Sequence, residues 1–420
     1  MFGKSSVFND TVQMTAAVAP VTLAEIEAAR ARLVGRVRTS PCARSRFLSE
    51  ATGANVLLKL ENLQLMGSFK ERGACNRLLQ LSPDERRRGV IAASAGNHAL
   101  GVAYHARALG VPATIVMPRA SPLVKVMDTR ALGATVEQVA GGYDDAFETA
   151  ARLAAERGLV LIHAFDDRHV LAGQGTLGLE ILEQAPAVDA VLVAVGGGGL
   201  VAGIATAIKA TRPSVRVIGV QSEAMPAMRA ALREGQPVRI EPMRTIADGI
   251  AVGQVGALPF AAVGQLVDDV VTVDDEEIAE AILTLLEKEK TVAEGAGAAP
   301  LAALIHRELG LAGKTIVVVI GGGNIDVNLL SRIIDRGLEK SGRIMRARLL
   351  LPDRPGSLAQ LLAIVAQREA NILTVDHDRS AARLEMGQTY VDLRAETRGF
   401  EHTTEILEAL RAHGFVIGTG

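Results

Sequence analysis

Tryptophan is absent from the 420-residue chain, and aromatic residues make up only 3% of it. Neither sign of charge is in excess: 45 Lys and Arg residues face 47 Asp and Glu residues, which gives a formal net charge of −2. Without a basic surplus, the composition gives no basis for binding nucleic acid or another polyanion.

Cysteine is scarce, and long apolar runs are missing. The two cysteines, Cys42 and Cys75, form neither a ligand-spaced pair nor a disulfide framework of the kind found in secreted proteins. Gly, Asp or Arg interrupts every apolar run before it reaches membrane-spanning length. Residues 1–20 lack the apolar segment of a signal peptide and are expected to form a loose tail. We therefore expect a cytoplasmic protein with no membrane partner. The histidines show no metal-ligand spacing, so no metal site is expected.

Hydrophobic residues make up 49% of the chain, and short apolar strand patterns alternate with helical ones. This alternation predicts an α/β fold with parallel strands, in which ligands gather at the carboxyl ends. Thr22, followed by Glu25 three residues later, predicts a capped helix at the start. The predicted strands cover residues 56–60, 90–93, 113–117, 135–139, 160–162, 190–195, 215–220 and 315–320.

The composition changes near residue 340, and a length of 420 residues also favours more than one domain. Residues 343–420 read as strand, helix, strand, strand, helix and strand. This βαββαβ order predicts a small two-layer α+β domain. Its elements are expected at residues 344–351, 357–366, 371–377, 386–393, 402–413 and 415–417.

Lys70 lies in the sequence Gly67-Ser68-Phe69-Lys70-Glu71-Arg72-Gly73-Ala74, directly after a predicted strand. A lysine at a pocket wall after a strand end can lose its proton by desolvation and form a Schiff base. The alternative is an exposed lysine that merely lies next to glycine.

Four glycines, Gly196, Gly197, Gly198 and Gly199, follow the apolar strand 190–195 and precede a predicted helix. Bare backbone N–H groups and the positive end of a helix favour a phosphate site. A tight turn without a ligand is one alternative. A dinucleotide site is another, because residues 197–202 fit a loose G-x-G-x-x-A pattern. However, the next strand ends in Gln221, where such a site needs an acid.

Two further loops follow predicted strands. Ser94, Ala95, Gly96, Asn97 and His98 offer amides and polar side chains suited to a carboxylate or a phenolic oxygen, although Ser94 could serve only as a helix N-cap. The second loop is a glycine turn at residues 321–323, which could instead reflect close packing of a strand against a helix.

Together these features indicate a phosphorylated aldehyde cofactor, and residues 21–340 resemble the pyridoxal-phosphate enzymes of the tryptophan-synthase β fold. Within them the chain is most similar to the threonine/serine dehydratases. The resemblance implies fold type II, with two open parallel-sheet subdomains, the smaller at roughly 60–165. The matching motifs are residues 67–74, Ser94-Ala95-Gly96-Asn97-His98, Gly196–Gly199, residues 247–252, Glu294-Gly295-Ala296-Gly297 and residues 322–326.

The resemblance also implies roles for individual residues. The catalytic Lys70 would carry pyridoxal 5′-phosphate as a Schiff base and would later remove the α-proton of the substrate. The other cofactor contacts would be Phe69 at the ring, Asn97 at the ring hydroxyl, Gly196, Gly197, Gly198 and Gly199 at the phosphate, and Gly321 beside the pyridine nitrogen. Ser94, Ala95, Gly96, Asn97 and His98 would bind the substrate carboxylate.

The implied activity is β-elimination of water from L-threonine, which yields 2-oxobutanoate and ammonia, with L-serine as a slower substrate. Two residues depart from related proteins: Gly321 replaces a Ser or Cys, and Ala95 replaces the serine acid of serine racemases, which disfavours racemisation. A lyase for 3-hydroxyaspartate, a racemase, a dinucleotide-dependent oxidoreductase and a non-catalytic amino-acid sensor remain alternatives.

Residues 344–420 resemble an ACT domain through the motif at residues 353–358. Asp353, Gly356 and Ser357 would bind an amino-acid effector such as isoleucine or valine, and Asn371 would add a contact from a facing domain. The alternative is a dimerisation unit without a ligand. The family and this unit both suggest a homodimer or homotetramer.

Overall fold

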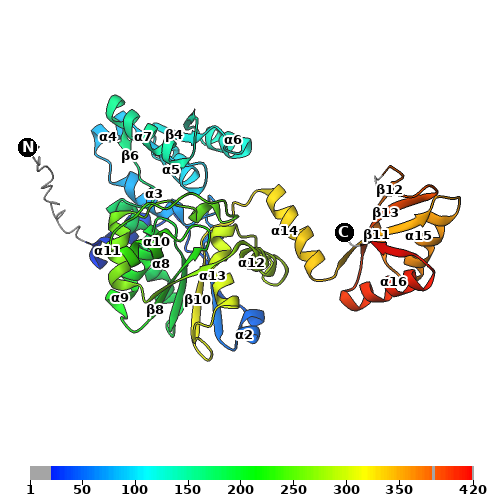
Figure 1. The fold of residues 1–420 in the computed structure, drawn as a ribbon. Coiled ribbons are helices and arrows are strands. Elements are labelled where there is room, and N and C mark those ends of the chain that lie inside the picture. Colours follow the sequence, from blue (N-terminus) through cyan, green and yellow to red (C-terminus); the bar gives the residue numbers. More distant parts are fainter. Residues whose placement is uncertain (1–19, 381–383, 419–420) are drawn as a thin grey trace, which may run out of the picture. The chain divides into compact units, whose positions relative to one another are not determined.

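The computed structural model describes residues 20–380 and 384–418. Most of the expected N-terminal tail, residues 1–19, lies outside this part of the chain. By its internal contacts the chain divides into two compact units, one up to Ile325 and one from Asp326 onward (Figure 1). Each unit has its own hydrophobic core.

The larger lobe of the first unit is built on a six-stranded sheet in the order β1-β2-β10-β7-β8-β9. All neighbours are parallel except β1 and β2. Apart from Thr315 at the start of β10, the central strands β7 and β10 consist of buried Ala, Val, Leu and Ile because helices cover both faces of a parallel sheet. The strands are β1 (Cys42–Arg44), β2 (Asn55–Leu60), β7 (Ala190–Ala194), β8 (Arg216–Ser222), β9 (Asp269–Val273) and β10 (Thr315–Ile320).

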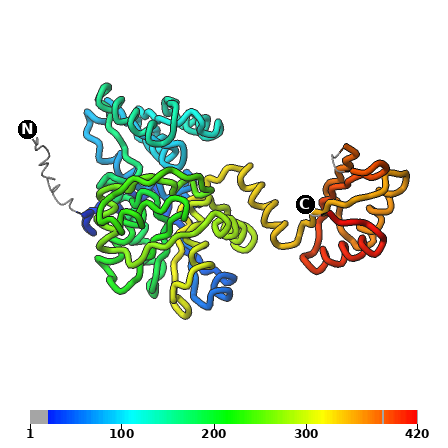
Figure 2. The backbone as a smooth tube through the Cα atoms, viewed as in Figure 1, coloured from blue at the N-terminus to red at the C-terminus, as the bar shows by residue number. Residues whose placement is uncertain are grey.

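Strand β10 inserts between strands that are distant in sequence. Val318 is in register with Leu58 of β2 on one side and with Leu192 of β7 on the other. In Figure 2 the yellow segment of the chain accordingly runs beside the blue one. Because the three strands are parallel, the loops after β2, β10 and β7 meet at one edge of the sheet.

The smaller lobe contains a four-stranded parallel sheet in the order β5-β4-β3-β6. Its strands match four of the predicted ones, which confirms the alternation of strands and helices in this region. They are β3 (Val90–Ala93), β4 (Ala113–Pro118), β5 (Thr135–Val139) and β6 (Val160–Leu161). Its helices are α3 (Lys70–Leu79), α4 (Pro83–Arg88), α5 (Asn97–Ala108), α6 (Leu123–Ala131) and α7 (Tyr143–Arg157).

The remaining helices of the first unit surround the large sheet. The predicted capping box is confirmed at α1, where the Thr22 side chain accepts from the Glu25 N–H. Helix α8 packs against α9 and leads the chain back from the smaller lobe. These helices are α1 (Leu23–Leu33), α2 (Arg46–Thr52), η1 (Glu61–Leu63), α8 (Arg168–Gln184), α9 (Gly199–Thr211), α10 (Ala227–Glu234), η2 (Asp248–Ile250), α11 (Ala257–Leu266), α12 (Asp275–Glu287) and α13 (Gly295–His306).

The second unit confirms the predicted βαββαβ order, and α14 (Val327–Lys340) precedes it. Its antiparallel sheet has the order β12-β13-β11-β14. Alternate residues of β13 are buried in a core that the sheet shares with the helices of residues 357–367 and 400–412. The sheet and these helices form the two layers. The elements are β11 (Ile344–Pro352), α15 (Ser357–Gln367), β12 (Asn371–Asp378), β13 (Gln388–Glu396), α16 (Phe400–Ala412) and β14 (Val416–Gly418).

Two strands were not predicted. β1 has only three residues, and β9 at the sheet edge mixes polar with apolar residues, so neither carries a strong periodic signal. Within residues 20–380 and 384–418, no helix is long and apolar enough to cross a membrane.

Candidate active site

A cavity of about 310 Å³ lies between the two lobes of the first unit, where the strand ends meet. All of the residues predicted to bind a cofactor or substrate line it. They are Phe69, Lys70, Ser94, Ala95, Gly96, Asn97, His98, Gly196, Gly197, Gly198, Gly199 and Gly321. The fold therefore brings together four sequence motifs that are far apart along the chain.

Lys70 is the first residue of α3, and the turn before it is tied to the end of β10. The Phe69 N–H donates to the Gly321 carbonyl at 3.0 Å. Lys70 Nζ donates to the Ala164 carbonyl at 3.2 Å and lies 5.3 Å from the centre of the Phe69 ring. Burial lowers the pKa of Lys70 to about 8, although the charge of Glu294 opposes this shift. A neutral amine is thus accessible near physiological pH.

The middle of the glycine loop has no room for side chains. A Cβ on Gly197 would overlap the Phe165 ring, and Gly198 has a φ of +95°, which strains other residues. The loop opens α9, and the first N–H groups of a helix have no acceptor within that helix. The arrangement is a cradle of backbone donors that suits a phosphate monoester.

The loop after β3 positions polar groups at the opposite wall. The helix α5 begins at Asn97 with Gly96 as its N-cap, while the Ser94 hydroxyl accepts from the Gly96 N–H at 3.1 Å. The alternative of Ser94 as a simple N-cap is therefore wrong. Burial and the charge of Lys70 lower the pKa of His98 to about 3, so its ring is neutral.

Glu294 is a cavity residue whose role the sequence did not indicate. It is 6% exposed, and its Oε1 accepts from Asn97 Nδ2 at 2.6 Å. Burial, assisted by the charge of Asp248, raises the pKa of Glu294 to about 7, against the hydrogen bond from Asn97 and the charges of Lys125 and Lys70. This buried carboxyl could have been suspected only from its place in a glycine-rich motif.

The raised pKa of Glu294 predicts a pH-dependent stability of the cofactor-free protein. Between the ordinary pKa of 4.5 and the value of about 7, the folded state holds a proton that the unfolded state releases, so stability falls as pH rises. Relative to Glu294→Gln, the unfolding free energy of the wild type should fall by about 2 to 3 kcal/mol from about pH 5 to about pH 8. Urea unfolding measures this difference.

The matched control for this prediction is Glu156→Gln, which removes an exposed carboxylate that pairs with Arg152. Its difference from the wild type should stay nearly constant over the same range. An equally flat difference for Glu294→Gln would contradict the buried, proton-holding carboxyl.

A second unpredicted feature is an ion pair that links the lobes at the cavity. Lys125 Nζ of α6 lies 3.3 Å from Asp248 Oδ2 of η2. Both residues line the cavity, and the Asp248 side chain is 66% exposed. The pair therefore lies at the solvent side of the site.

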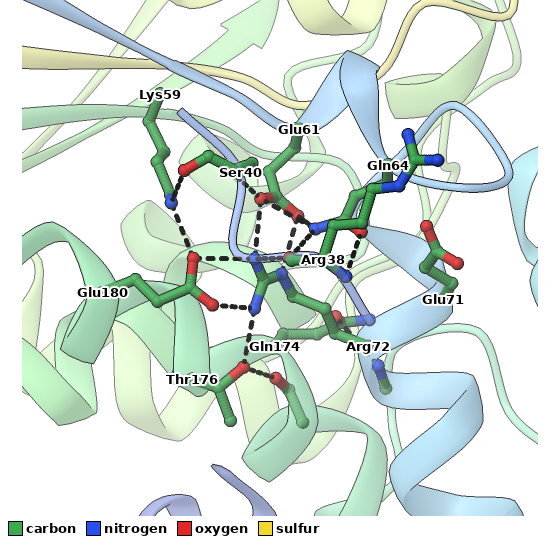
Figure 3. A network of polar contacts seen from close by, with 12 residues as sticks. Arg38, Ser40, Lys59, Glu61, Gln64, Glu71, Arg72, Gln174, Thr176 and Glu180 are labelled. Atoms are coloured by element: carbon green, nitrogen blue, oxygen red, sulfur yellow. Dashed lines mark hydrogen bonds and ion pairs between the residues drawn. The ribbon is translucent and has the colours of Figure 1, made fainter. Parts of the chain in front are cut away.

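Helix α3, which begins at Lys70, is held in place by a buried ionic network around Arg72 (Figure 3). Arg72 binds Glu61 with two of its nitrogens, at 2.7 and 2.8 Å, and Glu180 at 2.6 and 2.9 Å. Lys59 also binds Glu180, at 2.6 Å. Burial works to raise the pKa of Glu61, but the charge and hydrogen bonds of Arg72 hold it below its usual value. The network joins β2, α3 and α8.

The proposed regulatory residues lie in the second unit, and the structure does not bring all four together. Asp353 pairs with Arg379 at 3.0 Å, and Gly356, with a φ of +93°, caps α15 just before Ser357. Asn371 pairs in register with Glu396, at the end of the sheet opposite Asp353. One copy of the unit therefore presents only the first three residues as a set.

The cavity fits the implied cofactor. The glycine cradle and the amide of Asn97 offer hydrogen-bond donors for a phosphate and a ring hydroxyl, and the amine of Lys70 offers a nucleophile for an aldehyde. Within the described residues, no group of three or more His, Cys, Asp and Glu side chains is arranged to hold a metal ion.

A family model described as pyridoxal-phosphate dependent enzyme matches residues 34–322. The chain belongs to this family. Its cofactor is pyridoxal phosphate, and the predicted fold of two open parallel sheets is confirmed.

Similar proteins extend the match to both units. The chain is 51% identical over 397 residues to an L-threonine ammonia-lyase of Thermotoga maritima, covering 94% of this chain and 99% of the relative. It is 46% identical to one of Geobacter sulfurreducens, covering 95% and 98%. A crystal structure of a threonine deaminase from T.th. is 42% identical, with a TM-score of 0.69, covering 73% of this chain and 99% of that one.

Proposed function

We propose that this chain is a cytoplasmic L-threonine ammonia-lyase, which converts L-threonine to 2-oxobutanoate and ammonia and also accepts L-serine. The observation that carries this proposal is the cavity that joins Lys70, the glycine cradle and the Ser94–His98 loop. Similarity to L-threonine ammonia-lyases over almost the whole chain supports it.

Lys70 is the residue that we expect to move protons. Bound pyridoxal phosphate supplies an aldehyde for the substrate amine and an electron-withdrawing ring that makes the α-proton acidic. Burial lowers the pKa of Lys70 to about 8, so roughly a tenth of its amine is neutral at pH 7. It can therefore accept the α-proton as a general base.

The other lining residues bind and orient. The N–H groups of residues 197–199 would hold the phosphate, and the Asn97 amide would hold the ring hydroxyl. The amides and hydroxyl of the Ser94–His98 loop would bind the substrate carboxylate. Neutral His98 adds no charge there.

Elimination is favoured over racemisation by the residue at position 95. Ala95 lines the cavity and cannot donate a proton to the substrate from that position. Return of a proton to the opposite face of the α-carbon, which racemisation needs, therefore lacks an acid there.

Substrate profiling of the holoenzyme tests the proposal. Release of 2-oxo acid is measured from L-threonine, L-serine and threo-3-hydroxyaspartate, each with and without isoleucine. Threonine should give the highest kcat/KM. Turnover of 3-hydroxyaspartate alone, or of none of the three, would reject the assignment.

For the second unit we propose amino-acid control of the enzyme. Gly356 leaves the N-terminus of α15 open, and nothing lies within 4 Å of a Cβ built on it. This suits the carboxylate of an effector such as isoleucine or valine. Asn371 would contribute from a second copy, which implies a homodimer or homotetramer. A lack of any isoleucine effect in the assay would favour an assembly role for this unit.

A further inference from the structure

Three side chains from separate motifs form one continuous series of hydrogen bonds at the cavity. Asn324 Nδ2 donates to the Met66 carbonyl at 2.8 Å and to Asn97 Oδ1 at 2.7 Å. Asn97 Nδ2 in turn donates to Glu294 Oε1 at 2.6 Å. Residues 66, 97, 294 and 324 are thus linked, and two of them, Asn97 and Glu294, line the cavity.

The direction of this series is fixed by its first member. The Met66 carbonyl can only accept, so it must face the amide nitrogen of Asn324. That nitrogen has two hydrogens, and the second is given to Asn97, which must therefore present its oxygen. The Asn97 nitrogen then faces Glu294. One Nδ2 hydrogen of Asn97 is left for a ligand in the cavity.

Two glycines make room for the series. A Cβ on Gly67, which has a φ of +72°, would lie 2.5 Å from Asn324 Oδ1. A Cβ on Gly322 would overlap Glu294 Oε1 and would lie 3.1 Å from Asn97 Nδ2. The close approach of backbone to these side chains gives a physical reason for glycine at both positions.

We propose that Glu294 is a positioning residue: as the final acceptor of the series, it holds the Asn97 amide in the orientation that offers its remaining hydrogen to the cofactor. Glu294 acts through Asn97 and supplies no proton to the substrate. This role deepens the ammonia-lyase function proposed above and rests on it. Without an acceptor at position 294, the Asn97 nitrogen loses its partner and the amide is free to rotate.

Two substitutions separate the hydrogen bond from the charge. Glu294→Gln keeps an acceptor oxygen for Asn97, whereas Glu294→Ala removes it. For Glu294→Ala we expect the dissociation constant of pyridoxal phosphate to rise about tenfold, the value of one buried hydrogen bond. The kcat for threonine should fall with little change in KM. Glu294→Gln should stay within about threefold of the wild type in both measurements.

A double substitution tests whether the series acts as a unit. Asn324→Ala removes the donor that fixes the Asn97 oxygen, so it should weaken cofactor binding to a similar extent as Glu294→Ala. Combining the two should add little, because the Asn97 amide is already released by either change. Fully additive losses would show that Asn324 and Glu294 act separately and would overturn the proposal.

Asn62→Ala is the matched control. The Asn62 side chain is a 9% exposed amide that donates to Thr291 Oγ1 at 2.7 Å and to the Val292 carbonyl at 2.8 Å, shortly before Glu294 in the chain. It does not line the cavity. Its loss should lower the melting temperature but leave cofactor affinity and kcat near wild-type values.

The outcomes distinguish this inference from the function on which it rests. If Glu294→Gln is as impaired as Glu294→Ala, the charge matters and the positioning role is wrong. Unchanged cofactor affinity and kcat in Glu294→Ala would also overturn it. If the wild type binds the cofactor but does not deaminate threonine, the proposed function fails, while the cofactor affinities still test the role of Glu294.

Discussion

Lys70→Ala should abolish covalent attachment of the cofactor and lower threonine turnover by at least about 10³-fold, the usual effect of losing a group that transfers protons in catalysis. Among the residues that the structure describes, no other unpaired lysine lines the cavity. Lys125, the other lysine that lines the cavity, is paired with Asp248 at the solvent side. Borohydride reduction followed by peptide mapping should label the wild-type protein at Lys70 and leave the variant unlabelled.

Two comparisons sharpen this test. Lys70→Arg keeps the positive charge but has no accessible neutral form, so it should be as inactive as the alanine variant. Lys209→Ala removes a lysine that pairs with Asp268 on the outer surface, and it should retain activity. A label found on another lysine, or turnover retained by Lys70→Ala, would show that the nucleophile lies elsewhere.

Arg72→Ala should lower the free energy of unfolding by about 3 to 5 kcal/mol, because it leaves the buried carboxylate of Glu61 without its charged partner and removes one of the two cations that pair with Glu180. Glu61 is fully buried and Arg72 is 1% exposed, so water cannot replace the lost contacts. Urea unfolding of the cofactor-free protein measures the change.

The control is Arg152→Ala, which breaks an exposed pair with Glu156 one helical turn away. Such pairs contribute only about 0.3 to 0.5 kcal/mol. If Arg72→Ala costs no more than this control, the network shown in Figure 3 does not anchor α3. Since α3 begins at Lys70, loosening it should also weaken cofactor binding.

Local patterns in the sequence predicted most of the fold. Strand β3 has the predicted bounds because a short apolar run bounded by turn residues identifies a buried strand. Strand β5 also has the predicted bounds, although its residues are half-buried or exposed. The short strand β1 depends on pairing with β2, which no local pattern reports.

Residues that line the cavity were predicted where they lie within one motif, as with Lys70 or the four glycines. Glu294 was missed as an individual residue because its meaning depends on Asn97 and Asn324, which only tertiary structure brings to it. The pair of Lys125 and Asp248 likewise joins two lobes and has no signature in either segment. Long-range contacts of single side chains are thus the part that sequence reasoning could not supply.

The place of β10 also has a consequence for biosynthesis. On a ribosome, β2 and β7 leave the exit tunnel well before the strand that must separate them, so the large sheet cannot close until residue 320 has emerged. Until then, the apolar edges of both strands are exposed to chaperones or to mispairing. A nascent chain stalled before residue 315 should therefore bind no cofactor.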